Sequence, residues 1–238
     1  MIKGLLFDLN GTVIDIFTSE TDSQIYRTTA NFLDYYGVKI SPETLQEEYF
    51  SNMKRQKKES FEEFPEFDVV EVFSDIIRKY HTGNIPPPDP ATAAIVFRAA
   101  GRYRLEPYSG VLPVLNQLKN KFKMAAISDG QKIWAIPELH SAGLDKFFEF
   151  TVVSSDYGFR KPDSRMFAAA LEKMQFSPQE VILVGNDMYR DIYGAHRIGM
   201  KNIFFKSNQG EQSFFDAEAD YIIYNFNELP YAIDFLCR

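Results

Sequence analysis

Short apolar runs recur along the second half of the chain and predict buried β-strands. Each run is about four residues long, is rich in β-branched or aromatic residues, and ends at a glycine, serine, asparagine or aspartate. The runs are 124–127, 150–153, 181–184, 202–205 and, more weakly, 221–224, and residues 5–7 predict one further strand. Strands that are apolar throughout are typical of parallel sheets covered on both faces.

Stretches with helical periodicity separate these runs. Residues 131–142 predict a helix that ends at Gly143, and Gly199 ends another. The segment Ser177-Pro178-Gln179-Glu180 has the form of a capping box at the start of a helix. Alternation of strands and helices predicts an α/β fold, with a Rossmann-like parallel sheet and helices on both of its faces.

The stretch from about residue 16 to residue 104 has a different pattern, with four helical segments and no convincing strand. The helical segments lie at 25–36, 42–53, 69–80 and 90–97, and the proline-rich residues 83–88 predict a stiff connector. We therefore expect an α/β core formed by residues 1–15 and 105–238. An all-helical domain of residues 16–104 would be inserted after the first strand.

Composition narrows the classes of protein to which the chain can belong. The 238 residues include 26 Lys and Arg against 33 Asp and Glu, so the net charge of −7 offers no basic face to a nucleic acid. The single Cys237 rules out an intrachain disulfide and a cysteine-based zinc site. No apolar run has the length of a membrane helix, and Asp8 follows the first apolar residues too soon for a signal peptide. We expect a cytoplasmic protein, monomeric or homodimeric, without a membrane or nucleic-acid partner.

Polar side chains follow the predicted strands. Asp8 follows the first strand, Ser128 begins a Ser-Asp-Gly turn after the second, and Asp187 and Asp191 follow 181–184. Lys161 precedes a proline in the loop after 150–153. Each residue taken alone is explained as a helix cap, a dipole partner or a solvated charge. Carboxyl ends of parallel strands meet at one edge, however, so together they predict a site there, with Asp187 and Asp191 facing the same way.

The ordered set D-x-N-G-T, S-D-G, K-P and G-N-D-x-x-x-D resembles the motifs of the haloacid dehalogenase-like hydrolase superfamily. The resemblance covers essentially the whole chain, and the chain is similar to the phosphatase branch, in which a helical cap is inserted after the first motif. It implies that Asp8 is the nucleophile and forms an aspartyl-phosphate. It further implies that Ser128, the N–H of Asp129 and Lys161 bind the phosphoryl group of a small phosphorylated metabolite. The substrate site would also include Leu9 and Asn10.

The same resemblance implies a Mg²⁺ site formed by Asp8, the backbone carbonyl of Asn10, Asp187 and Asp191, the last directly or through water. Three carboxylates and a phosphomonoester carry a charge of about −5, and each like-charged pair costs about 4 kcal/mol at 4 Å and an effective dielectric constant of 20. One Mg²⁺ and Lys161 would supply +3 against this charge.

Asn10 departs from the family pattern, because phosphatases of this family carry a second aspartate at that position. That aspartate protonates the leaving oxygen and then activates water, whereas an amide has no titratable proton near pH 7. General acid–base catalysis contributes about 10²–10⁴-fold, or about 3–5 kcal/mol of barrier. The sequence thus predicts a slow enzyme with a normal phosphate site. Another proton carrier, an introduced substitution that traps an intermediate, or a binding protein without turnover would each explain Asn10.

Two other functions compete with a Mg²⁺-dependent phosphatase. A haloacid dehalogenase also lacks the second aspartate, but it needs no metal carboxylates and usually carries tyrosine at the position of Asn10. A non-catalytic protein that binds a phosphorylated ligand would explain Asn10. It would not explain the presence of Asp8, Ser128, Lys161, Asp187 and Asp191 together.

Overall fold

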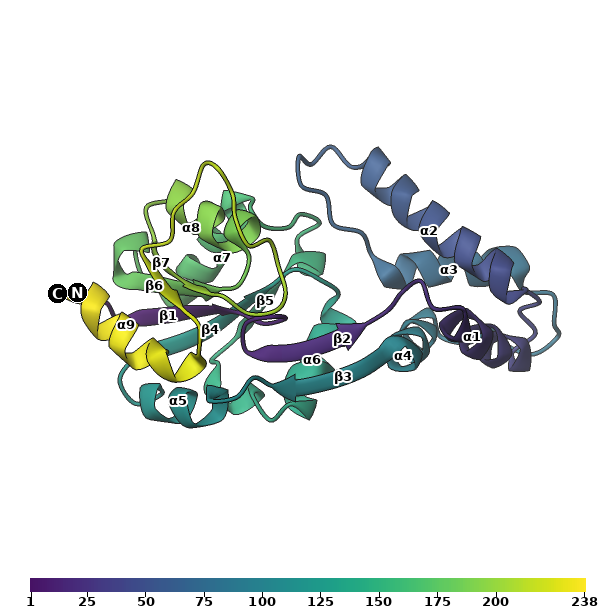
Figure 1. Cartoon of the computed structure of the whole chain (residues 1–238). Coiled ribbons are helices and arrows are strands. Elements are labelled where there is room, and N and C mark those ends of the chain that lie inside the picture. The colour runs from purple at the N-terminus through teal and green to yellow at the C-terminus, as the bar shows by residue number, and fades with distance from the viewer.

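The computed structural model describes residues 1–238 and is built on a six-stranded parallel sheet of order β5-β4-β1-β6-β7-β8 (Figure 1). The strands are β1 (Gly4–Asp8), β4 (Lys123–Ser128), β5 (Thr151–Val153), β6 (Val181–Gly185), β7 (Lys201–Phe205) and β8 (Tyr221–Ile223). All five strand pairs are parallel. The α/β fold class and its six strands are therefore confirmed.

Helices cover both faces of this sheet. Helices α5 (Val111–Leu118) and α9 (Leu229–Leu236) lie on one face, and α7 (Ser164–Met174) and α8 (Gly194–Arg197) lie on the other (Figure 1). The alternation of side chains along β1 explains why both faces need a cover, because Leu5 and Phe7 pack on one side and Leu6 packs on the other. Helix α6 (Lys132–Ser141) follows β4.

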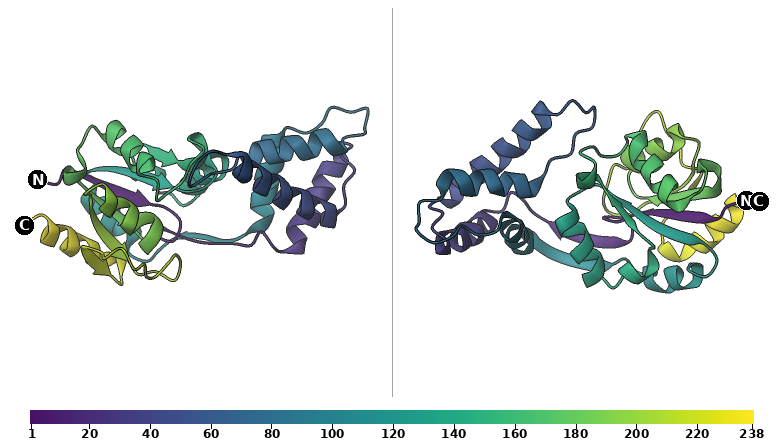
Figure 2. Two further views of the ribbon diagram at one scale, coloured as in Figure 1. Left: turned by 90° about the horizontal axis from the view of Figure 1, so that it is seen from above. Right: turned by 180° about the vertical axis from the view of Figure 1, so that it is seen from behind.

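Four helices lie beyond the end of the sheet (Figures 1 and 2). They are α1 (Ser23–Tyr35), α2 (Pro42–Glu59), α3 (Val69–Tyr80) and α4 (Pro90–Gly101), and they pack around an apolar cluster of their own. Their N-cap residues Asp22, Ser41, Asp68 and Asp89 each accept hydrogen bonds from first-turn amides. Sequence patterns of local capping and periodicity therefore located all four.

An antiparallel pair of strands that the sequence did not predict joins the four helices to the sheet. Strand β2 (Ile14–Thr18) pairs with β3 (Arg102–Pro107). Most of β3 is exposed or half-buried, so it lacks the apolar run on which the strand predictions rested. The predicted domain boundaries fall within these two strands, and the division into two domains stays a prediction. The predicted helix at Ser177 is only the 3-10 turn Pro178–Glu180, because β6 begins at Val181.

The helical region also contacts the core directly, on the side of the carboxyl ends of the strands. Glu66 N–H donates to the carbonyl of Gly158 (3.0 Å), and Arg160 N–H donates to the carbonyl of Phe64 (2.9 Å). Trp134 of α6 packs in the apolar cluster of the four helices and donates its indole N–H to the carbonyl of Ala94 (2.9 Å). These contacts close the helical region over the edge of the sheet where the strands end. None of the helices is long and apolar enough to span a lipid bilayer.

Candidate active site

Three neighbouring strands bring most of the predicted site residues to one edge. Asp8 is the last residue of β1, Ser128 is the last residue of β4, and β6 ends at Gly185. Strand β1 lies between the other two, with Asp8 paired to Ile127 and Phe7 paired to Val184. Parallel strands start their connecting loops at the same edge, so residues that are more than 100 positions apart meet there.

Lys161 lies at the centre of this edge. Its Nζ donates to Oδ1 of Asp8 and to Oδ1 of Asp191, at 2.6 Å in each case, and all three side chains are buried. Burial alone would lower the pKa of Lys161, but the charges of Asp191 and Asp8 hold it above its usual range. Lys161 is therefore a permanent cation that offsets one of the two carboxylates.

Asp191 is fixed by its position in the turn that follows β6. Its Oδ2 accepts the backbone N–H groups of Asn186 and Asp187, both at 3.1 Å, while Oδ1 faces Lys161. Burial raises the pKa of Asp191 to about 6, against the opposing charge of Lys161, and the charge of Asp8 adds to the rise. The structure thus brings Asp8, Lys161 and Asp191 together.

Asp187 does not share this environment, which corrects the prediction that it faces the same way as Asp191. It is the N-cap of the π-helical turn η4 (Met188–Tyr193), and its Oδ1 accepts the N–H groups of Tyr189 (3.1 Å) and Arg190 (2.7 Å). Its Oδ2 accepts Arg190 Nε at 2.9 Å. Burial raises its pKa, but Arg190 outweighs burial and holds the pKa of Asp187 below its usual range.

The predicted carboxylate trio therefore does not form a ligand group in this arrangement. No three Asp, Glu, His or Cys side chains of the chain lie close enough together to hold a metal ion. The physical reason is local. The free amides at the start of η4 and the guanidinium of Arg190 together satisfy both oxygens of Asp187.

Asn186 is a site residue that the sequence reasoning missed. Thr12 Oγ1 lies 2.9 Å from Oδ2 of Asp8 and 2.9 Å from the side-chain amide of Asn186, and all three residues are buried. A hydroxyl has one proton, so both contacts are hydrogen bonds only when the amide faces Thr12 through its NH₂ group. The Asn186 amide and the Thr12 hydroxyl then orient Asp8. The position of Asn186 directly after a buried strand was the available signal.

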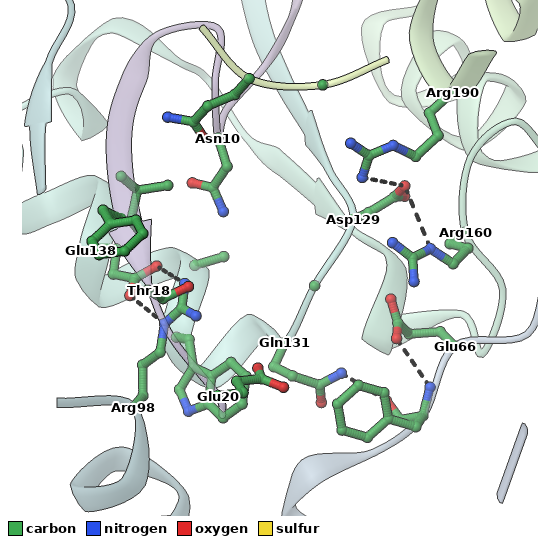
Figure 3. A pocket seen from close by; sticks show the side chains of 18 of the residues that line it. Asn10, Thr18, Glu20, Glu66, Arg98, Asp129, Gln131, Glu138, Arg160 and Arg190 are labelled. Carbon is green, nitrogen blue, oxygen red and sulfur yellow. Dashed lines mark hydrogen bonds and ion pairs between the residues drawn. The ribbon is translucent and has the colours of Figure 1, made fainter. Parts of the chain in front are cut away.

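Only some of the other predicted residues line the cleft. The Asn10 side chain lines the cleft and makes no hydrogen bond to protein (Figure 3). Ser128 is buried, and its hydroxyl lies 3.5 Å from the carbonyl of Asp129, its one near partner. Asp129 accepts the N–H of Lys161 at 2.9 Å. The Leu9 side chain packs in the core and does not line the cleft, so a role of Leu9 in substrate binding would involve its backbone and stays a prediction.

A cleft of about 620 Å³ separates the core edge from the four-helix region. Asn10, Asp129 and Asn186 line it on the core side, and Met53 and Lys57 line it on the helical side. A second cavity of about 630 Å³ opens onto Lys161. Both cavities share three cations that sequence reasoning did not assign to the site, which are Lys57, Arg160 and Arg190. Arg160 adjoins Lys161, and Lys57 lies in the basic run 54–58, which by sequence is typical of a solvated helix surface.

The charges where the cleft meets the second cavity are only partly paired. Arg160 Nε lies 3.6 Å and Arg190 Nη1 lies 4.0 Å from Oδ2 of Asp129, an oxygen that is buried and accepts no hydrogen bond (Figure 3). Lys57 has no ion-pair partner and lies over the ring of Phe67, with 5.2 Å between Nζ and the ring centroid. Burial and the charge of Arg160 lower the pKa of Lys57. This side of the cleft therefore favours an anion.

Comparisons with known proteins identify the family of the chain. The family model described as haloacid dehalogenase-like hydrolase matches residues 5–205. The glyceraldehyde 3-phosphate phosphatase of Pyrococcus furiosus is 30% identical over 243 residues, which span 100% of this chain and 94% of that protein. The pyrophosphatase PpaX of Bacillus pumilus is 26% identical, over 96% of this chain and 94% of its own.

Solved structures agree with the fold. A 2-haloacid dehalogenase from Pseudomonas syringae superposes with a TM-score of 0.68 at 21% identity, over 98% of this chain and 99% of its own. A HAD phosphatase from Thermococcus onnurineus superposes with a TM-score of 0.63 at 20% identity, over 98% of both chains. The family model spans most of the chain, and a full-length relative reaches 30% identity. The chain therefore belongs to the haloacid dehalogenase-like hydrolase family and is an enzyme of that class.

Proposed function

We propose that this protein is a Mg²⁺-dependent phosphatase that hydrolyses a small phosphomonoester through an aspartyl-phosphate on Asp8. The observation that carries the proposal is the buried Asp8 carboxylate, held at 2.6 Å from the permanent cation Lys161 beside a cleft that favours anions. The phosphatases among its relatives, which match over nearly the whole chain, support the same reaction class.

The residues at the sheet edge have separate roles in this proposal. An oxygen of Asp8 attacks phosphorus, and the bond between phosphorus and the leaving oxygen breaks. The Thr12 hydroxyl and Lys161 hold Asp8 in one orientation. Ser128 Oγ, which has no close acceptor, and the N–H of Asp129 donate to phosphoryl oxygens. Lys161 offsets the charge that the phosphoryl group brings to two carboxylates.

The donor chemistry at this edge suits Mg²⁺. The cation is hard, prefers oxygen ligands, and is usually held by one or two carboxylates together with water and substrate phosphate. Asp8, the backbone carbonyl of Asn10 and Asp191 are oxygen donors at one edge. Asp187 would join them only by leaving Arg190. When bound, the ion would supply positive charge to the phosphoryl group.

Asn10 limits the rate in this proposal. The leaving oxygen needs a proton, and the water that cleaves the aspartyl-phosphate must lose one. The amide of Asn10 lines the cleft but carries no titratable proton. We therefore place the protein among slow phosphatases with an intact phosphate site.

The deciding experiment is hydrolysis of p-nitrophenyl phosphate with Mg²⁺ by the wild type, Asp8→Asn and the control Asp216→Asn, which changes an exposed aspartate. We expect Asp8→Asn to abolish turnover, Asp216→Asn to leave it unchanged, and EDTA to remove it until Mg²⁺ is restored. Full activity of Asp8→Asn would exclude Asp8 as nucleophile. Activity that survives EDTA would exclude the metal requirement.

The two alternatives give different results in the same assays. A haloacid dehalogenase would release chloride from 2-chloropropionate with or without EDTA. A non-catalytic protein would bind inorganic phosphate but would give equal background rates in the wild type and in Asp8→Asn.

A further inference from the structure

Glu20 is an unpaired carboxylate at the helical end of the cleft. It lies in the link between β2 and α1, and its half-buried side chain lines the cleft (Figure 3). Figure 3 places Glu20 beside Arg98 and Glu138, with Asn10 at the opposite end of the cleft. Its carboxylate forms no ion pair, and the Tyr49 hydroxyl is the protein group that lies close enough to donate to it.

Two of the polar groups around Glu20 already have partners. Arg98 is held by both oxygens of Glu138, at 2.7 Å and 3.1 Å, and both side chains are largely buried. Gln131 is held by the N–H of Val69 at 2.9 Å and the carbonyl of Phe67 at 2.7 Å. Neither Arg98 nor Gln131 is therefore free to donate a hydrogen bond to Glu20.

Glu20 is also partly withdrawn from water. Burial raises its pKa, and the charge of Arg98, the nearby Tyr49 hydroxyl and Lys57 oppose the rise. The Tyr49 hydroxyl is itself buried and has no hydrogen-bond partner other than Glu20. A carboxylate with one protein donor keeps further acceptor sites, which a ligand that donates hydrogen bonds can fill.

The two ends of the cleft therefore differ in charge. Arg160 and Arg190 lie where the cleft meets the cavity of Lys161, whereas Glu20 does not line that cavity. A molecule that fits both ends carries an anion at one end and hydrogen-bond donors at the other. Neutral hydroxyl donors suit Glu20 better than an ammonium group, because Arg98 and Lys57 already place positive charge near it.

We propose that Glu20 binds hydroxyl groups of the leaving group, so that the preferred substrates are polyhydroxylated phosphomonoesters, such as sugar or polyol phosphates. This inference rests on the proposed function, since it specifies the substrate class of the same site. Glu20 acts as a specificity residue here, and its carboxylate accepts hydrogen bonds while the phosphoryl group lies at the Asp8 end.

The test compares Glu20→Ala and Glu20→Gln with the control Glu47→Ala, which changes an exposed glutamate of α2. The substrates are D-glucose 6-phosphate, D-ribose 5-phosphate, glycerol 3-phosphate, O-phosphoethanolamine and p-nitrophenyl phosphate. Loss of a hydrogen bond to a charged group corresponds to about tenfold or more in affinity. We expect Glu20→Ala to raise the KM of the best polyol phosphate by about that factor, and to change kcat/KM for p-nitrophenyl phosphate by less than about twofold.

The Glu20→Gln variant retains an acceptor oxygen, so its KM should lie between those of the wild type and Glu20→Ala. Equal losses on all substrates, unchanged KM values for every polyol phosphate, or a loss confined to O-phosphoethanolamine would overturn the proposal.

Calorimetry separates failure of this proposal from failure of the proposed function. Binding of the same five phosphate esters is measured in the Asp8→Asn background, where the nucleophile is absent, with and without Glu20→Ala. We expect a polyol phosphate to bind best and to lose about tenfold in affinity with Glu20→Ala. If the wild type hydrolyses none of the esters but this loss is seen, the phosphatase proposal fails and Glu20 remains a hydroxyl-binding residue. If Asp8→Asn binds the esters equally well with and without Glu20→Ala, the assignment of Glu20 fails.

Discussion

Lys161 is 3% exposed and forms two ion pairs of 2.6 Å, so its one positive charge is shared by two negative ones, Asp8 and Asp191. The trio keeps a net charge of −1, and a phosphoryl group adds about −2 at neutral pH. Two other polar residues of the site, Asn10 and Asn186, are amides. At the residue scale, the site is therefore equipped to bind and orient a phosphoryl group and poorly equipped to move protons.

The substitution Asn10→Asp tests this view of single residues. We expect it to raise turnover of p-nitrophenyl phosphate with Mg²⁺ by at least about tenfold, because a carboxyl group at the cleft supplies the missing acid and base. Asn208→Asp, the same amide-to-acid change elsewhere in the cleft lining, is the control and should have little effect. A wild type that is already fast, with no gain in Asn10→Asp, would refute the acid–base explanation.

Glu20 predicts a pH dependence of stability. Burial raises its folded-state pKa above the unfolded value, so above pH 4.5 the folded state binds more protons than the unfolded state, and the free energy of unfolding falls as the pH rises through the folded pKa. We expect the free energy of unfolding, measured with urea, to fall by more between pH 4.5 and 7 in the wild type than in Glu20→Gln. If the free energies of unfolding of the two proteins change in parallel with pH, the pKa of Glu20 is not raised in the folded state.

At the scale of elements, each short turn after a strand decides which side chains enter the site. The turn η4 uses Asp187 as its N-cap and Asp191 as an inward-facing carboxylate, although the two are only four residues apart. Asp187 thus stabilises the turn that places Asp191 against Lys161. In this arrangement Asp187 stabilises the local fold, because it accepts hydrogen bonds from amides that would otherwise lack partners.

This role can be measured by substituting Asp187. We expect Asp187→Ala to lower the free energy of unfolding by about 1–2 kcal/mol, the usual cost of losing an N-cap. Asp187→Asn should cost less, because asparagine is an equally good N-cap residue. Chemical denaturation of the three proteins gives the comparison, and an Asp187→Ala variant as stable as the wild type would show that the cap bonds contribute nothing.

At the scale of the whole molecule, the cleft exists because the four-helix region closes over the sheet edge. The contacts that hold it there include the backbone bonds between residues 64–66 and 158–160, the ion pair of Glu62 with Arg165, and the hydrogen bond that Ser154 Oγ donates to the buried Glu66 carboxylate at 2.7 Å. Ser154 Oγ also accepts the N–H of Gly130 at 2.8 Å. One hydroxyl thereby links the helical region to the turn that follows Ser128.

Ser154→Ala tests this link. The change leaves the Glu66 carboxylate with one fewer donor and the Gly130 N–H without its acceptor, so we expect a loss of about 1–3 kcal/mol in the free energy of unfolding. Faster hydrogen exchange at the amides of Glu66 and Arg160 should accompany it. Ser213→Ala, at an exposed serine, is the control, and equal stability of both variants would show that the link does not hold the helical region closed.

The sequence by itself determined the six strands, the four inserted helices and the place of Asp8, Ser128 and Lys161 near strand ends, because apolar runs, helix caps and strand-end residues are local signals. The tertiary structure alone decided the pairing of β2 with β3, the turning of Asp187 toward Arg190, the contact of Asn186 with Thr12, and the exposure of Glu20 in the cleft. Each of these depends on which distant residue lies opposite. Spacing along one chain does not encode that choice, because hydrogen bonds and ion pairs form only after the layers have packed.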